Sequence, residues 1–193
     1  MRKTLKIIAI FAVLFIGVYY VGRKVNLNPS HSVGDVIDNL NNVKVYYNGG
    51  VGNIEERNVV DGYNIGMKYQ CVEFVKRYYF EHYNHRMPDT YGNAKDFYNQ
   101  QLEDGKLNSQ RGLVQHTNPS SSKPKVGDLI VMDATFLNKY GHVAIISEVS
   151  NNTIEIIQQN PGPYSNSRET FPLENIDGKW QILNDRIMGW LRK

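Results

Sequence analysis

The sequence is poor in the residues that build metal centres and covalent cross-links. Among its 193 residues there is one cysteine, Cys71, and the five histidines are scattered along the chain. No zinc-type Cys/His cluster can therefore be assembled from neighbouring residues. The sequence also has no glycine-rich phosphate-binding loop and no internal repeat. These absences argue against zinc modules, nucleotide-binding enzymes and repeat proteins.

Acidic residues are missing from the first 24 positions, which carry five basic ones. The whole chain has 22 basic and 19 acidic residues, so residues 25–193 hold 17 basic against 19 acidic, a net charge of about −2. The formal charge of +3 therefore comes from the N-terminal segment. Nucleic-acid binding needs a basic patch on the folded domain, and we expect no nucleic-acid partner.

The N-terminal segment is an uninterrupted apolar run, Ile7–Gly22, behind a short basic leader. This is the pattern of a secretory signal, but small residues do not stand at the positions that a cleavage site requires. The run ends at Arg23-Lys24, a charged pair typical of a membrane edge. We favour an uncleaved anchor, with residues 5–22 in the membrane, and keep a cleaved signal peptide as the alternative.

The leader carries more positive charge than Arg23-Lys24, so the positive-inside rule keeps the N-terminus in the cytoplasm and sends the remainder outside. We thus predict a bacterial cytoplasmic-membrane protein with its domain facing outside, or a secreted one if the leader is cleaved. Exported domains usually hold cysteines in pairs. An unpaired Cys71 in such a domain suggests a reactive thiol or an intermolecular bridge.

Apolar periodicity predicts an α+β protein with helices first and antiparallel strands second. After a linker and short helix in residues 25–42, we place the main domain at residues 43–190. The predicted elements are a helix at 33–40, a strand at 43–47, a loop at 48–66, helices at 71–83 and 93–100, a loop at 102–125, strands at 127–133, 141–149 and 153–160, and a last strand pair at 180–183 and 186–191.

Cys71 begins the predicted helix 71–83. A thiol at a helix N-terminus faces unpaired backbone N–H groups and the positive end of the helix dipole, and both favour the nucleophilic thiolate. The backbone N–H of Cys71 is also a natural oxyanion donor. Taken alone, however, a free cysteine is usually a small buried apolar residue.

His142 opens a predicted strand directly after Gly141, at a sheet edge beside a loop. In the hairpin register we expect, Asn160 lies opposite His142 and Gln158 lies one diagonal step away, on the same face. Cysteine catalysis needs a thiolate, a histidine that shuttles the proton and a polar group that orients the imidazole. Each of these residues, taken by itself, is more simply explained as structural. The catalytic hypothesis therefore depends on their occurring together with a single cysteine in an exported domain.

Four ordered motifs resemble the CHAP family, the cysteine, histidine-dependent amidohydrolases/peptidases. They are Gln70-Cys71-Val72-Glu73-Phe74, then residues 126–131 (VGDLIV), then 141–145 (GHVAI), then Gln158-Gln159-Asn160. The first is also similar to the amidase domain of glutathionylspermidine synthetase/amidase. The resemblance implies a papain-like fold, N-terminal helices packed on an antiparallel sheet, and no metal or organic cofactor.

By that resemblance Cys71 is the nucleophile and His142 the general base and later acid. Members often have glutamate where this chain has Gln158, and a neutral amide stabilises an imidazolium less than a carboxylate does. Asn160 is the second candidate for orienting the ring, and the Gln70 side chain is a candidate oxyanion donor. Asp61 and Asp128 could bind calcium, as some members of the family do. The sequence has no EF-hand-like spacing, so we interpret both as structural.

The resulting hypothesis is an exported cysteine amidase or endopeptidase that acts on the stem or cross-bridge peptides of peptidoglycan through a thioester. Wall peptides are the abundant amides outside a bacterial membrane. One alternative is a small-molecule amidase of the glutathionylspermidine type, which the export signal disfavours. Another is a non-catalytic domain that binds wall peptides, supported only by Gln158 in place of glutamate.

Overall fold

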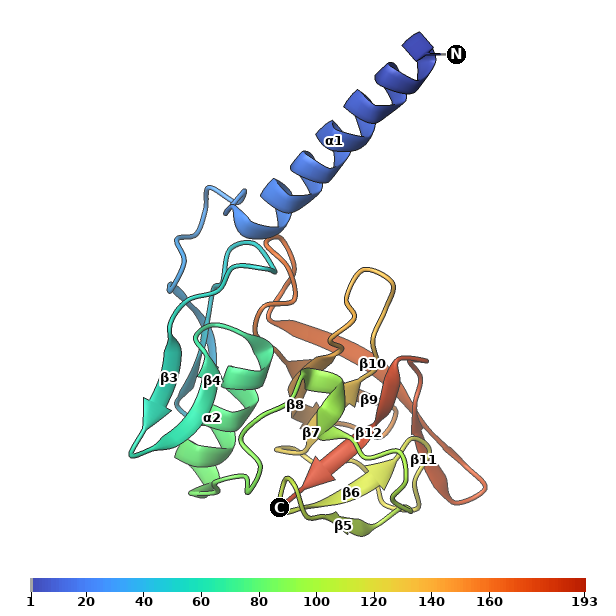
Figure 1. The fold of residues 1–193 in the computed structure, drawn as a ribbon. Coiled ribbons are helices and arrows are strands. Elements are labelled where there is room, and N and C mark those ends of the chain that lie inside the picture. The colour runs from blue at the N-terminus through green and yellow to red at the C-terminus, as the bar shows by residue number, and fades with distance from the viewer. Residues whose placement is uncertain (1) are drawn as a thin grey trace.

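The structure is a computed structural model that describes residues 2–193, with side chains described from residue 5. Met1 and the side chains of Arg2 and Lys3, part of the predicted leader, lie outside the described residues. The helices are α1 (Arg2–Lys24), α2 (Cys71–Tyr83) and the short 3₁₀ helix η1 (Ala94–Phe97) (Figure 1). The strands are β1 (Val36–Leu40), β2 (Val43–Tyr46), β3 (Arg57–Val60), β4 (Tyr63–Met67), β5 (Lys106–Asn108), β6 (Leu113–Thr117), β7 (Leu129–Met132), β8 (His142–Val149), β9 (Thr153–Ile157), β10 (Arg168–Ile176), β11 (Lys179–Ile182) and β12 (Ile187–Arg192).

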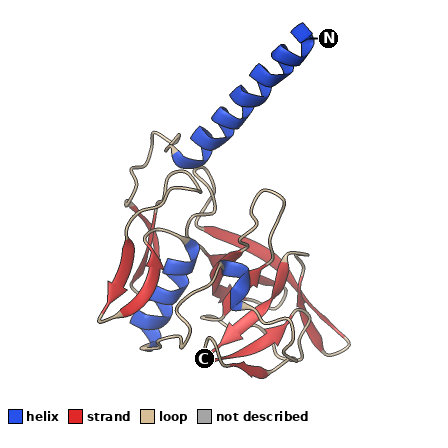
Figure 2. Cartoon of the chain, viewed as in Figure 1, coloured by secondary structure: helices blue, strands red, loops and turns tan. Residues whose placement is uncertain are grey.

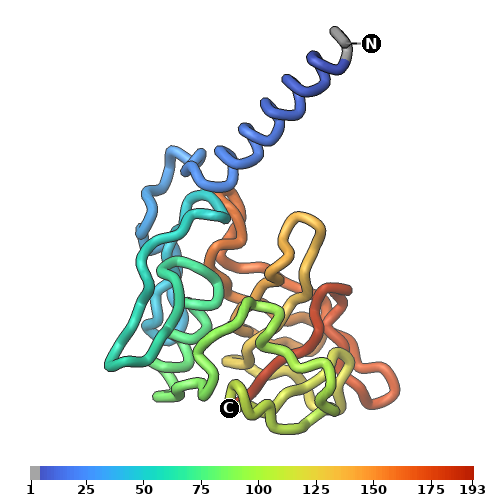
Figure 3. Tube along the Cα trace, viewed as in Figure 1, coloured from blue at the N-terminus to red at the C-terminus, as the bar shows by residue number. Residues whose placement is uncertain are grey.

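Helix α1 stands away from the rest of the protein (Figure 3). Its segment Leu5–Lys24 is long and apolar enough to cross a membrane, and none of it is buried against the domain. At 1.5 Å per residue the 23-residue helix is about 35 Å long, which matches the hydrocarbon core of a bilayer. A membrane anchor and a signal sequence both fit this description.

Eight strands form one antiparallel sheet in the order β11-β10-β9-β8-β7-β12-β6-β5, and two separate hairpins pair β1 with β2 and β3 with β4 (Figure 2). The protein is thus a mixture of helix and antiparallel sheet. Helix α2 lies between the main sheet, where it packs on β8, and the hairpin strands β2 and β4. Because the chain runs from α2 back to the sheet, residues distant in sequence meet at the N-terminal end of α2.

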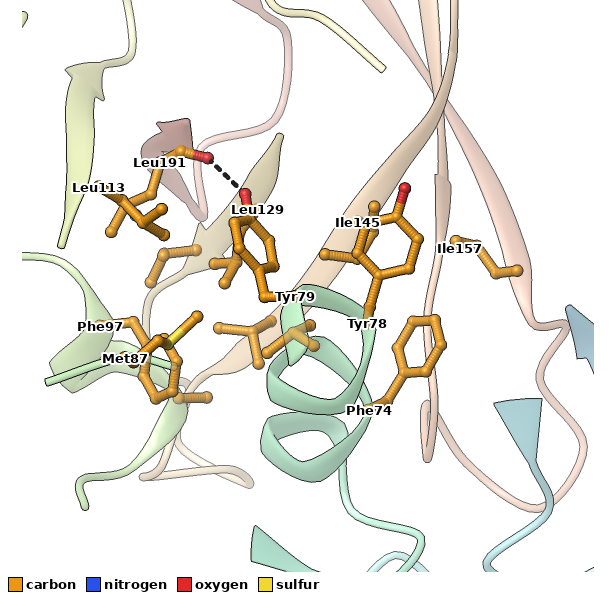
Figure 4. Close-up of a cluster of buried hydrophobic side chains, with 14 of the residues drawn as sticks. Phe74, Tyr78, Tyr79, Met87, Phe97, Leu113, Leu129, Ile145, Ile157 and Leu191 are labelled. Atoms are coloured by element: carbon orange, nitrogen blue, oxygen red, sulfur yellow. Dashed lines mark hydrogen bonds between the residues drawn. The ribbon is translucent and has the colours of Figure 1, made fainter. Parts of the chain in front are cut away.

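Successive residues of the central strands alternate between two hydrophobic clusters, as the period of a strand requires. On β7, Leu129 and Val131 face the cluster under α2, whereas Ile130 and Met132 face a second cluster. Figure 4 shows the first of these clusters, with the aromatic side chains of α2 against the sheet. At one side of this cluster, the Tyr79 hydroxyl donates a hydrogen bond to the backbone oxygen of Leu191 at 3.1 Å.

The second cluster is enclosed by the main sheet itself. Its largest member is Trp190, which is fully buried together with Ile154 and Ile156 of β9. A β-bridge between Ser120 and Trp180 joins the β11 edge to the segment after β6, so the sheet curls around this cluster. One face of the curled sheet covers this second cluster. The other face packs against α2, and there β8 contacts the helix.

The predicted helix at 33–40 is wrong, because residues 36–40 form β1. The apolar residues in this segment recur at helical spacing, which explains the error. Pairing with β2 decides otherwise: Asn41 and Asn42 have positive φ angles of 49° and 67°, the geometry of a two-residue hairpin turn.

Both predicted long loops contain strands. Residues 48–66 include β3 and part of β4, which are joined at Asp61-Gly62, again with positive φ at both positions. An Asp-Gly pair between apolar segments is a strong hairpin signal that the prediction missed. Residues 102–125 include β5 and β6. Four strands therefore precede α2, and the predicted order of helices before strands is wrong.

The predicted pairing of the last two strands is also wrong. Strand β11 pairs with β10, which the prediction lacked, whereas β12 inserts between β6 and β7. Their neighbours come from distant parts of the chain, which local patterns do not reveal. The strands at 127–133, 141–149 and 153–160 are confirmed, each shorter than predicted, β8 by one residue only. The helix η1 lies within the short helix expected at 93–100.

Candidate active site

Cys71 is the first residue of α2, as predicted. Gln70 precedes it with an extended backbone, and the Gln70 carbonyl accepts the first helical hydrogen bond, from the N–H of Phe74 at 3.1 Å. One face of the helix is anchored by completely buried side chains, among them Phe74 and Tyr78. This apolar face fixes the rotation of α2 and therefore the direction in which Cys71 points.

A buried polar network ties the first turn of α2 to the segment directly after β9. The Glu73 carboxylate accepts from Arg77 at 2.7 Å and from the side chain of Gln159 at 2.9 Å. Gln159 also donates to the Gln70 carbonyl at 3.0 Å, and its own oxygen accepts from the Tyr46 N–H at 2.7 Å. Glu73 thus has a structural role, joining these two segments. The sequence analysis missed this positioning role of Gln159. Neighbouring side chains of an extended segment point to opposite faces, so Gln159 had to face away from the side on which Gln158 meets His142.

His142 is the first residue of β8, and a glycine determines where that strand begins. Gly141 has φ of +75°, and a Cβ there would lie 2.6 Å from the Met132 oxygen and 3.0 Å from the backbone nitrogen of Lys95. Only glycine fits both the angle and the space. The chain therefore turns tightly into β8 where it passes β7 and η1. His142 is 9% exposed and is held at the end of β8, which is an interior strand and not the sheet edge that the sequence suggested.

The observed register agrees with the predicted one. Ile145 pairs with Ile157 and Ile146 with Ile156, which carries Gln158 to within reach of His142. The imidazole Nε2 lies 2.9 Å from the Gln158 Oε1, and Gln158 is only 4% exposed. An amide oxygen only accepts hydrogen bonds, so Nε2 carries the hydrogen and Nδ1 remains free to accept a proton.

The orientation of the Gln158 amide is set by its other end. Its nitrogen faces the backbone oxygen of Asn166 at 3.4 Å and a carboxylate oxygen of Glu169 at 3.5 Å, and both can only accept. The amide oxygen is consequently turned toward His142.

Asn160 and Gln70 bond to each other instead of to the histidine. The Asn160 nitrogen donates to Gln70 Oε1 at 2.9 Å and to the Val51 carbonyl at 3.1 Å. The Gln70 nitrogen donates to the Asn53 carbonyl at 2.6 Å. Asn160 therefore holds Gln70 beside Cys71 and leaves the orientation of His142 to Gln158.

Cys71 Sγ lies against the start of β8. The backbone N–H groups of Val143, Val72 and Cys71 itself are near enough to the sulfur to lower the pKa of the thiol, and Val143 is the neighbour of His142. Between the described side chains of Cys71 and His142 there is no direct hydrogen bond, a contact that often tightens only when substrate is bound. The two residues are thus brought to one location by the packing of α2 on β8.

Burial decides the protonation of both groups. It raises the pKa of the Cys71 thiol, and the three N–H groups offset this only in part. Burial thus opposes the thiolate that the helix N-terminus favours. Burial likewise lowers the pKa of His142 to about 4, opposed by the Gln158 hydrogen bond. At neutral pH the site holds a thiol beside a neutral imidazole, which can act as a base.

Asp61 and Asp128 serve structural roles in the described chain. Asp128 is buried and accepts from Arg192 at 2.6 Å and from the Lys125 N–H at 2.8 Å. Asp61 is exposed and 3.6 Å from Arg86. Among the described residues no group of three or more His, Cys, Asp or Glu side chains is placed to hold a metal ion. Two surface hollows, beside Asn184 and beside Lys95, are lined by neither Cys71 nor His142.

Comparison with known proteins gives three kinds of similarity. A sequence model of the CHAP domain matches residues 62–160. Trypanothione synthetase of Crithidia fasciculata is 29% identical over 136 residues, 67% of this chain and 20% of the relative. The bifunctional glutathionylspermidine synthetase/amidase of Escherichia coli (strain K12) is 31% identical over 106 residues, 54% of this chain and 17% of the relative. The chain thus spans about a fifth of the length of these relatives.

Among solved structures, that of the wild-type endolysin LysIME-EF1 aligns with 73% of this chain and 57% of its own, with a TM-score of 0.39 and 23% identity. The family assignment rests on the sequence model of the CHAP domain. That match covers half of the chain and includes Cys71, His142 and Gln158. This chain therefore belongs to the CHAP domain family, a family of amidase- and peptidase-type hydrolases.

Proposed function

We propose that this protein is an exported, membrane-anchored cysteine amidase or endopeptidase that hydrolyses amide bonds of peptidoglycan stem or cross-bridge peptides. The observation that carries the proposal is the hydrogen bond between His142 Nε2 and Gln158, next to the strand position where the Cys71 sulfur lies. A papain-like site has its nucleophile on a helix, its base on a sheet and an amide behind the base. This is the arrangement that cysteine catalysis needs.

In the proposed reaction, His142 Nδ1 takes the thiol proton as Sγ of Cys71 attacks the amide carbon. The same proton then passes to the leaving amine, the C–N bond breaks and a thioester remains. Water, deprotonated by His142, attacks the thioester, and the proton returns to the thiolate as the acid leaves. The N–H of Cys71 is the proposed oxyanion donor, and Gln70 is the second, since its amide nitrogen has one hydrogen beyond that given to Asn53.

Helix α1 supports the location in this proposal. A single exposed apolar helix at the N-terminus, followed by Arg23-Lys24, suits an anchor that leaves the domain outside the membrane. Peptide amides of the wall are then the substrate within reach.

The second candidate function is hydrolysis of a small glutathionylspermidine-like amide. It is favoured by the similarity to the synthetase/amidase relatives, which the wall hypothesis does not explain. A third is non-catalytic binding of wall peptides, and it is favoured by Gln158, an amide where members of the family often have glutamate. Both alternatives use the same site. The second would release a different product, and the third would release none.

One experiment separates these functions. The full-length protein in mild detergent is incubated with purified peptidoglycan and, in parallel, with glutathionylspermidine, and the products are identified by mass. New amines or stem peptides from the wall support the first proposal. Cleavage of glutathionylspermidine alone supports the second. Binding to the wall with no product from either substrate would leave only the third.

The pH dependence tests whether Gln158 orients His142. The base must be unprotonated, so with its low pKa, about 4, we expect kcat/KM to fall only when the pH drops through that value. A carboxylate at position 158 would favour the imidazolium, and in the variant Gln158→Glu/Glu169→Gln we expect the acid limb to move upward by roughly 1–3 pH units. The Glu169 change removes a second carboxylate that would otherwise face the new one.

Glu169→Gln alone is the matched control, and its acid limb should stay in place. The measurement is kcat/KM across the acid range for the parent, the control and the double variant. An unchanged acid limb in the double variant would show that Gln158 does not set the protonation of His142.

A further inference from the structure

Three loops of the domain meet the C-terminal end of α1. The loop after β2 donates from the Gly52 N–H to the Arg23 carbonyl at 2.8 Å, and Gly50 packs so closely that a Cβ there would be 2.3 Å from the same oxygen. The loop between β7 and β8 accepts from the Arg23 guanidinium through the Leu137 carbonyl at 3.0 Å. The loop after β9 reaches the following segment, where the Tyr164 hydroxyl donates to the Leu27 carbonyl at 2.6 Å.

These loops carry large apolar side chains that nothing in the described structure covers. Phe136 is fully exposed, and Ile54, Leu137 and Tyr164 are 66%, 66% and 69% exposed. In Figure 1 the loop between β7 and β8 extends toward the base of α1. Exposed apolar groups gathered at one end of a protein mark a contact surface.

The end of α1 indicates what that surface contacts. Tyr19 and Tyr20 are packed edge to face there, and Arg23 follows one turn later, with its guanidinium on the Tyr19 hydroxyl at 2.9 Å. Tyrosines followed by basic residues are typical of the level at which a spanning helix leaves the hydrocarbon. Because the loops bond to Arg23 itself, their tips lie at that same level. Lys24 and Lys139 add positive charge beside them, which suits anionic lipid headgroups.

We propose that Ile54, Phe136, Leu137 and Tyr164 form a membrane-contacting surface that seats in the headgroup and upper acyl region of the bilayer that α1 crosses. The contact is with phospholipid, and basic side chains flank it as in other interfacial segments. It rests on α1 being the anchor of the proposed function but does not require that the site be active.

The same loops also build the candidate active site. Asn53 and Val51, in the first loop, accept from Gln70 and Asn160. The second loop ends at His142, and the third begins after Gln158. Seating these loops in the interface turns the site toward the membrane surface. The substrate class is thereby narrowed to amides presented close to the bilayer, in the wall layer nearest the membrane or on a lipid-linked precursor.

Tryptophan fluorescence of the full-length protein in vesicles tests the contact directly. Phe136→Trp and Ile54→Trp are placed in vesicles of phosphatidylethanolamine and phosphatidylglycerol that contain a lipid with a quencher near the glycerol. Leu107→Trp is the matched control, since Leu107 is 61% exposed on β5, away from α1 (Figure 1). The emission of the unchanged protein, which comes from Trp180 and Trp190, is subtracted. For the remaining emission we expect about two-fold quenching at positions 136 and 54, because interfacial groups sit roughly 5–10 Å deep, and little at 107.

Quenching at 136 or 54 no greater than at 107 would overturn the proposal. Emission at 136 that shifts to the blue with rising protein concentration, without lipid quenching, would assign the surface to a second copy of the chain instead. The substitutions replace exposed side chains, so they leave the packed core unchanged. The readout needs no catalysis, and an inactive enzyme that still shows quenching would reject the proposed function while supporting the membrane contact.

Discussion

Cys71→Ala is expected to reduce amide hydrolysis to background, a loss of about 10³-fold or more, because the attacking atom is gone and no other residue can form the thioester. The chain has no second cysteine that could take over. The measurement is the initial rate of amine release from purified wall material by the full-length protein. The same substitution should change the free energy of unfolding by only about 1 kcal/mol, since one half-buried sulfur is removed.

Alkylation provides the control for this prediction. Because Cys71 is the only thiol, one iodoacetamide group per chain, located by mass, should inactivate the protein. With the pKa of the thiol raised by burial, the alkylation rate should keep increasing into the alkaline range. Full hydrolysis by the alanine variant, with its fold intact, would remove Cys71 from the reaction.

Glu73→Ala should destabilise the protein by about 3–5 kcal/mol, because it leaves a buried guanidinium without its carboxylate. Glu73 is 2% exposed and Arg77 is 6% exposed, with 2.7 Å between their bonded atoms. The loss would also remove one of the two hydrogen bonds that the Gln159 side-chain nitrogen donates to the start of α2. The measurement is the urea unfolding midpoint at constant slope.

Glu56→Ala is the matched control, because it removes the carboxylate of an ion pair on the surface, that with Lys68. Solvent screens such a pair, so no measurable shift in the midpoint is expected. Glu73→Ala/Arg77→Met should recover part of the loss, because it leaves no unpaired charge. Equal midpoints for Glu73→Ala and Glu56→Ala would show that the buried network does not hold the helix in place.

Local patterns were sufficient for the elements that carry the site. Helix α2 follows from apolar residues repeating at three and four positions, and it begins at Cys71 as predicted. The hairpin of β8 and β9 follows from alternation around an Asn-Asn turn, so its register could be predicted as well. Both are interactions between residues close in sequence.

Local sequence patterns did not predict the elements whose structure depends on pairing with distant strands. The segment 36–40 has helical spacing but becomes a strand because β2 lies beside it, and β12 finds its partners in β6 and β7 across the chain. Asn160 was a candidate partner of His142, yet Gln70 and Val51 take its hydrogen bonds. No local rule identifies such competitors.

The sequence by itself determined which residue types are available for chemistry: one thiol at a helix start, one histidine at a strand start and an amide on the neighbouring strand. Only the tertiary structure decided their protonation and their surroundings. A helix N-terminus favours a thiolate, but burying Cys71 and His142 where α2 meets β8 removes water and favours the neutral form of each. Burial depends on every element packed around a residue, and the order of residues along the chain does not specify it locally.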